Sequence, residues 1–157
     1  MAYKTLPPPG YPGNHLHPFY NIDSAVGPNK RNQQDDVMLV QLCLQQIYAS
    51  ALLPWNSEWE AREWHWIYAD GKFGPITQNA IWIFQSQMEA RGVNIYPDGV
   101  VDHASDWRGL TSTQRSYTVL WLNWCLSQVI GPDRFAHLDI DKITPRVLAV
   151  RLGVSDF

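Results

Sequence analysis

The side chains of this sequence that are able to do acid-base or metal chemistry are few and scattered. Glu58, Glu60 and Glu63 are close enough to form the carboxylate pair that a glycosidase needs around a sugar bond. They lie near a predicted helix start, however, where glutamates ordinarily interact with the helix macrodipole. The five histidines form no HExxH or related zinc signature, and neither cysteine has the neighbours of a nucleophile. We therefore expect a protein that is not an enzyme and that holds no metal or other cofactor.

The clearest local pattern is a pair of Asp-Gly turns, one on each side of a single predicted helix. Asp70-Gly71 and Asp98-Gly99 each combine an aspartate that bonds its own backbone with a glycine that tolerates positive φ. Between them, Pro75 suits the first position of a helix. Apolar side chains then recur at helical offsets, and the face they form contains Ile76, Ala80, Ile83, Phe84 and Gln87. The stretch therefore predicts a turn, a helix and a second turn.

These residues resemble the peptidoglycan-binding-like domain, a small three-helix module attached to many bacterial cell-wall hydrolases. The resemblance rests on Asp70-Gly71-x-Phe73-Gly74-x-x-Thr77-x-x-Ala80-x-x-x-Phe84-Gln85, followed by Asp98-Gly99-x-Val101. Upstream, Asp36-Val37-x-x-Val40-Gln41-x-x-Leu44 is similar to the first helix of that family. The similarity covers residues 35–102, interrupted by an insertion at 53–68, and it implies a helical fold that binds a cell-wall ligand.

The helical periodicities predict an all-α fold with no strand. A first helix over 33–50 carries an inward stripe of Val37, Val40, Leu44 and Ile47. After the helix that begins at Pro75, a capping-box pattern, Thr111-x-x-Gln114, predicts another helix from about Thr113 to Ile130, ended by Gly131-Pro132. A last short helix follows Thr144-Pro145 and ends at Gly153. We thus expect a three-helix core with a Trp-rich insertion after the first helix and additional C-terminal helices within 111–152.

Residues 1–32 are predicted to form an extended arm rich in Pro and Gly, and residues 33–157 to form one helical domain.

Composition limits the class of partner. The net charge of −3 and the pI near 5.9 argue against nucleic acid or an anionic membrane surface as partner. No signal peptide or membrane span is recognisable, so we expect cytoplasmic synthesis, with a non-classical route to the periplasm or exterior left open. Cys43 and Cys125 are expected to be small buried hydrophobes.

The resemblance implies a shallow groove beside residues 70–85 that binds peptidoglycan or a muropeptide. In such a groove Lys72 would pair with a carboxylate of the peptide stem, and Trp82 would stack on a ring. Thr77, Gln85 and Asp98 would hydrogen-bond amides or sugar hydroxyls. Each residue also has a structural alternative, because an Asp of this kind forms turns, a Thr near a helix start bonds backbone, and Trp82 can pack on the third helix.

A second class of function rests on the eight tryptophans of the chain. Trp55, Trp59 and Trp64 fall in the 53–68 insertion, where flat rings beside polar groups suit protein docking as well as sugar stacking. The insertion can equally pack on the main core and only enlarge it. If the rings are exposed and dock a protein, we expect the chain to keep the fold for protein–protein interaction, for example as a component or cargo of a bacterial secretion or phage-tail-like assembly.

Overall fold

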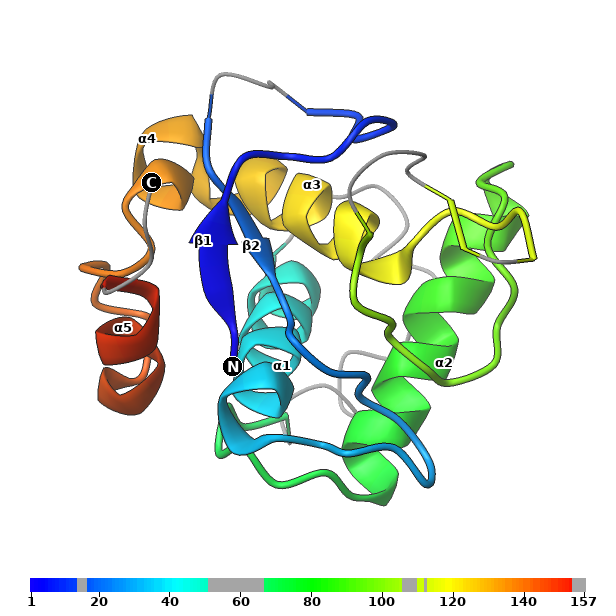
Figure 1. The fold of residues 1–157 in the computed structure, drawn as a ribbon, viewed down its shortest axis with the longest axis horizontal. Coiled ribbons are helices and arrows are strands. Elements are labelled where there is room, and N and C mark those ends of the chain that lie inside the picture. Colours follow the sequence, from blue (N-terminus) through cyan, green and yellow to red (C-terminus); the bar gives the residue numbers. More distant parts are fainter. Residues whose placement is uncertain (14–16, 51–66, 106–109, 112, 154–157) are drawn as a thin grey trace.

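A central helix, α1 (Gln34–Ala49), organises the fold and is in contact with helices on several sides. The computed structural model describes residues 1–13, 17–50, 67–105, 110–111 and 113–153. Its other elements are β1 (Tyr3–Thr5), β2 (Phe19–Asn21), α2 (Pro75–Ala90), α3 (Thr118–Ile130), α4 (Pro132–Ala136) and α5 (Arg146–Gly153). Figure 1 shows α2 and α5 on opposite sides of α1, with α3 crossing it. The fold is mostly helical, as predicted, with one small sheet that was not.

Burial of α1 extends well beyond the single stripe that periodicity predicts. The four predicted residues are buried, and so are Met38, Leu39, Leu42 and Cys43 on the remaining faces. A helix that is apolar on most of its faces needs neighbours all round, and α2, α3 and α5 supply them. On α2 the predicted face is buried at Ala80, Ile83, Phe84 and Gln87, whereas Ile76 in the first turn is 53% exposed.

The N-terminal segment contributes two short strands that pack into the core. β1 pairs antiparallel with β2, and Phe19, Tyr20 and Ile22 are essentially buried. Asn123 of α3 holds the backbone of Tyr20 in both directions, with a 2.9 Å bond to its N–H and a 2.8 Å bond from the Asn123 amide to its carbonyl. The expectation of no strand was therefore wrong, because tertiary partners stabilise two strands too short to be recognised from their sequences.

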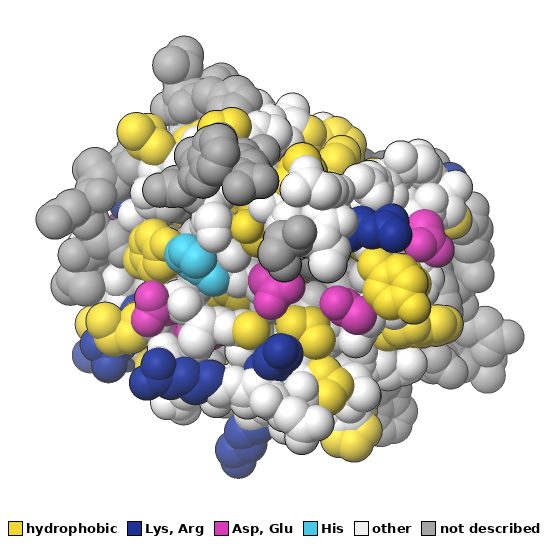
Figure 2. Space-filling view, turned by 45° about the vertical axis from the view of Figure 1, so that its right-hand side comes forward, with side chains coloured by type: hydrophobic (Ala, Val, Ile, Leu, Met, Phe, Trp, Pro, Cys, Tyr) yellow, Lys and Arg dark blue, Asp and Glu magenta, His cyan; other side chains and the backbone are white. Residues whose placement is uncertain are grey.

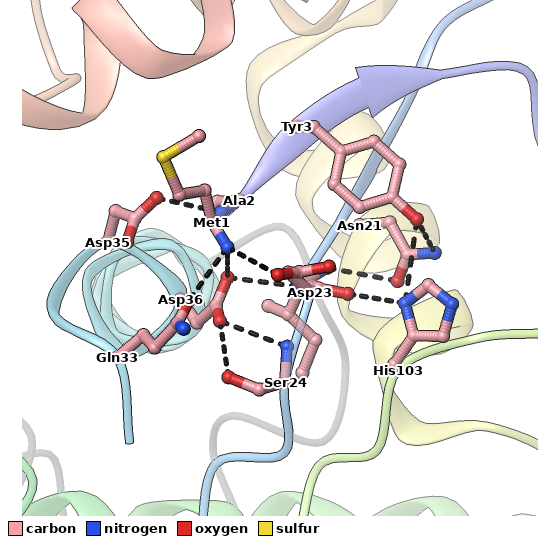
Figure 3. Close-up of polar contacts among 11 residues, drawn as sticks. Met1, Ala2, Tyr3, Asn21, Asp23, Ser24, Gln33, Asp35, Asp36 and His103 are labelled. Carbon is pink, nitrogen blue, oxygen red and sulfur yellow. Dashed lines mark hydrogen bonds and ion pairs between the residues drawn. The ribbon is translucent and has the colours of Figure 1, made fainter. Parts of the chain in front are cut away.

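Acidic side chains in the first turn of α1 attach this segment to the helix (Figure 3). Asp35 accepts the N–H of Ala2 at 2.8 Å. Asp36, fully buried, accepts the N–H groups of Asp23 and Ser24, both at 3.1 Å, and the Ser24 hydroxyl at 3.0 Å. Burial raises the pKa of Asp36, and these bonds offset part of that rise. The carboxylates thus satisfy loop donors while lying at the positive end of the helix macrodipole.

The third helix begins later than the capping-box pattern indicates. It starts at Thr118, and the Thr111 to Arg115 segment instead closes a turn in which the Thr111 N–H bonds the Arg115 carbonyl at 2.7 Å. Gln114 has a φ of +61°, which is incompatible with a helix interior. The Thr111 hydroxyl accepts the N–H of Arg115 at 3.1 Å, so the residue that suggested a helix cap stabilises a turn.

The C-terminal part follows the predicted order with one additional element. Gly131, at a φ of +88°, ends α3, and Pro132 begins the short helix α4, for which no pattern was identified in the sequence. α5 ends at Gly153, as predicted. Among the described residues, no helix combines the length and the apolar character needed to cross a membrane.

Both cysteines behave as the sequence predicts. Cys43 and Cys125 are free thiols, 2% and 0% exposed. Burial raises the pKa of each to about 12, so both thiols are protonated and unreactive at neutral pH.

Candidate functional site

Each Asp-Gly turn is held by one buried glutamine from the preceding helix. At the first turn, the side-chain amide nitrogen of Gln41 lies 3.1 Å from Asp70 Oδ1, 3.0 Å from the Lys72 carbonyl and 3.0 Å from the Thr77 hydroxyl. Its amide oxygen accepts the N–H of Gly71 at 2.8 Å. Gln41 is only 2% exposed, so this network connects α1, the turn and the start of α2 inside the protein.

The second turn repeats this network. The side-chain amide nitrogen of Gln85 lies 3.2 Å from Asp98 Oδ1, 2.9 Å from the Val100 carbonyl and 3.0 Å from the Thr118 hydroxyl. Its amide oxygen accepts the N–H of Gly99 at 2.8 Å. Gln85 is 1% exposed, and the network connects α2, the turn and the first residue of α3.

The two networks show that the chain contains an internal structural duplication. Both turn glycines have a φ of +76°, and both aspartates accept the N–H two residues on, at 2.9 Å. Buried apolar residues of α1 and α2 match at the same spacing that separates the glutamines: Val37 with Ile81, Val40 with Phe84, and Leu44 with Met88. The repeat is visible in the sequence as Tyr-x-Asp-Gly at residues 68–71 and 96–99, a signal that reading one turn at a time overlooks.

The five predicted ligand-binding residues do not form one groove. Gln85 and Thr77, 1% and 5% exposed, are buried members of the two networks, and the Thr77 hydroxyl bonds the Gln41 side chain. Lys72 and Asp98 are exposed, each at a different turn, and Trp82 is 48% exposed on α2. The tertiary structure therefore separates these residues into accessible groups at the surface and buried groups that position the turns.

A polar groove of about 460 Å³ lies beside the second turn. Gln85 and Thr118 are its buried lining, and the 94–102 loop contributes Tyr96, Asp98 and Asp102. The turn before α3 supplies the facing side chains, namely Thr111, Thr113, Arg115 and Ser116. Figure 2 brings the side of the molecule that carries α2 forward and shows acidic and basic side chains among hydrophobic ones on this face. We call this hollow the Asp98 groove.

The charges of the Asp98 groove are of both signs. Burial raises the pKa of Asp102, and the nearby carboxylate of Asp98 raises it further. The Arg115 guanidinium donates to the Asn94 side-chain oxygen at 3.0 Å and lies 5.8 Å from the centroid of the Tyr96 ring. Tyr96 is 60% exposed, so its ring is accessible beside the guanidinium and the two carboxylates. This combination suits a ligand that carries both an amine and a carboxylate next to an apolar ring face.

A smaller hollow of about 250 Å³ lies beside the first turn. Its lining includes the exposed side chains of Tyr68, Asp70, Lys72 and Ile76 and the buried Ile67. We call it the Asp70 groove. Tyr68 is 64% exposed and occupies the same place before its turn as Tyr96 does before the other.

His103 lines a third hollow together with Tyr3 and Asn21. Its Nδ1 lies 2.6 Å from the Ile22 carbonyl oxygen, which can only accept, so that nitrogen carries the proton in the neutral ring. The Asn21 amide donates to the Tyr3 hydroxyl at 3.2 Å and to the Ala104 carbonyl at 3.0 Å. These bonds fasten the 103–104 segment to β2. In the part of the chain that the structure describes, no three His, Cys, Asp or Glu residues gather as a metal site.

Two sets of predicted residues lie outside the described ranges. The docking tryptophans Trp55, Trp59 and Trp64 fall in the undescribed segment 51–66, as do the three glutamates considered for catalysis. The docking hypothesis for that insertion stays a prediction.

In comparisons of the chain with protein-family models, with curated proteins and with solved structures, nothing matches. The resemblance to the peptidoglycan-binding-like domain stays a hypothesis that rests on the residues quoted above.

Proposed function

We propose that this protein is a non-catalytic module that binds bacterial cell-wall peptidoglycan through the Asp98 groove. The observation that carries the proposal is the juxtaposition of an exposed tyrosine ring, one guanidinium and two carboxylates in one open groove lined with hydroxyl groups. Peptidoglycan offers the matching groups, because its sugars have ring faces and hydroxyls and its peptide stems carry amines and carboxylates. The resemblance of residues 35–102 to a wall-binding family supports the same ligand class.

Each exposed group has a role in this proposal. Tyr96 stacks on a sugar ring, and Arg115, held beside that ring by Asn94, pairs with a stem carboxylate. Asp98 and Asp102 accept from a stem amine or from sugar hydroxyls. Gln85 contacts no ligand and instead positions the turn, because its amide is already bonded on both sides within the protein.

Binding to purified sacculi tests the proposal. Wild-type protein should sediment with sacculi, and Arg115→Ala should weaken that binding about tenfold or more, because it removes a charge-assisted contact. Arg146→Ala, at an exposed arginine of α5, is the matched control and should bind like wild type. Full binding by Arg115→Ala, or no sedimentation of wild-type protein at any ionic strength, would contradict the proposal.

A second candidate is docking to a protein of a secretion or phage-tail-like assembly. The exposure of Ile76 (53%) and Trp82 (48%) on α2 favours it, because large apolar side chains at a surface often anchor protein partners. Trp82→Ala separates the two functions, because it should abolish capture of a protein partner if α2 docks one and should leave sacculus binding through the Asp98 groove intact.

A further inference from the structure

The duplicated turn networks imply more than a shared fold, because each presents the same kinds of side chain at its surface. In both units an exposed tyrosine precedes an exposed aspartate by two residues, and the glycine that follows is buried. In both, a buried glutamine and a threonine at the next helix start fix the turn from inside. A hollow opens beside each turn.

We propose that the Asp70 groove is a second binding site for the same class of ligand, an amino-sugar and peptide unit of the cell wall, so that one chain holds two such units. This inference rests on the function proposed above. Its basis is that the Asp70 groove lies beside the same turn backbone and presents the same three kinds of side chain, on a lining that is otherwise more apolar than that of the Asp98 groove.

Each groove combines a ring, a carboxylate and a cation. The ring and carboxylate come from equivalent positions, Tyr68 and Asp70 in one groove and Tyr96 and Asp98 in the other. The cation comes from different positions. Lys72 supplies it in the Asp70 groove, where the equivalent residue of the second unit is Val100, and Arg115 supplies it in the Asp98 groove.

The length of chain between each Asp-Gly turn and the next helix differs between the two units. In the first unit the chain runs directly from Asp70 to Thr77 at the start of α2. In the second, the path from Asp98 to Thr118 is longer and includes the Thr111 to Arg115 turn, whose side chains form a facing wall. Among the described residues, none forms such a wall beside the Asp70 groove, whose volume is about 250 Å³ against about 460 Å³.

The two grooves are also spaced along one helix. Thr77 of α2 lines the Asp70 groove, and Gln85 of the same helix lines the Asp98 groove. The two residues are just over two helical turns apart, about 12 Å along the axis of α2. A helix is a rigid spacer at this length, so the two grooves keep a fixed separation. A polymer that repeats one chemical unit can occupy both grooves of one chain at once. Binding through two grooves makes the overall affinity for such a polymer higher than the affinity of either groove alone.

Titration with a soluble muropeptide monomer, one disaccharide carrying one stem peptide, tests the inference by stoichiometry. Calorimetry should find two molecules bound per chain in wild type and one in either Tyr68→Ala or Tyr96→Ala. The double variant should bind none. Both tyrosines are largely exposed, so each variant should keep the wild-type unfolding midpoint. Val150→Ala, at another exposed apolar residue, is the control and should bind two.

On intact sacculi either single tyrosine variant should bind about tenfold or more weakly than wild type, because avidity from the second groove is lost. One muropeptide per wild-type chain, lost on Tyr96→Ala and unaffected by Tyr68→Ala, would overturn the second site and leave the proposed function standing. No muropeptide or sacculus binding by the wild type would overturn both.

Discussion

The duplicated glutamine predicts a paired effect on stability that can be worked out from the hydrogen bonds. Replacing Gln85 by Met keeps the length of the side chain and removes its amide. The amide nitrogen has two hydrogens for three acceptors, and the amide oxygen accepts one bond from Gly99, so about three good bonds are lost. At about 0.5–1.5 kcal/mol net each, and with the buried Gly99 N–H left without its partner, the unfolding free energy should fall by about 2–4 kcal/mol.

Gln41→Met should cost a similar amount, because its four distances agree with those of Gln85 to within 0.1 Å. Urea unfolding followed by far-UV circular dichroism measures both, with stability read from a shifted midpoint at unchanged slope. Gln128→Met, at an exposed position of α3, is the control and should change stability by less than about 0.5 kcal/mol.

Amide hydrogen exchange gives the same prediction a site-specific form. In Gln85→Met the N–H of Gly99 should exchange faster while that of Gly71 stays protected, and in Gln41→Met the pattern should reverse. A loss of stability below about 1 kcal/mol in both variants, or equal loss of protection at both glycines in each variant, would refute the idea that each glutamine holds its own turn.

Three further perturbations test the core, one carboxylate and the thiols. Phe84→Ala should lower the unfolding free energy by about 3–5 kcal/mol in urea, because the ring is 0% exposed and leaves a cavity, and a loss below about 1 kcal/mol would contradict its place in the core. Asp102 has a raised pKa in the folded protein, so folding favours its protonated form and stability should fall as pH rises through that pKa. In Asp102→Asn the urea midpoint should no longer fall as pH rises through the pKa of Asp102. A variant whose midpoint depends on pH as in wild type would contradict this role of Asp102. Cys43 and Cys125 should not react with a thiol reagent in native protein, and both should react in denaturant, because burial raises each pKa to about 12. Rapid native labelling would show that α1 and α3 separate easily.

The sequence by itself determined the elements whose signals are local. Helical periodicity and a proline at the first position were sufficient for α2, and a glycine at a positive φ ended α3 as expected. The two Asp-Gly turns were also predicted, because an aspartate bonding its own backbone and a glycine with positive φ are properties of neighbouring residues.

Only the tertiary structure decided the features that depend on distant partners. β1 and β2 are each three residues long and depend on Asn123 and on the acidic first turn of α1, far along the chain, so no local pattern reveals them. The start of α3 was misplaced because Thr111 and Gln114 match a cap locally, whereas their actual bonds close a turn beside Asn94.

The role of Gln85 likewise could not be read from its neighbours in the chain. A glutamine amide bonds a ligand or a backbone turn equally well, and only burial to 1% with partners at Gly99 and Thr118 decides for the turn. The same reasoning separates Lys72 and Asp98 into two grooves, because each lies beside a different Asp-Gly turn and the two turns lie at different places once the helices pack around α1.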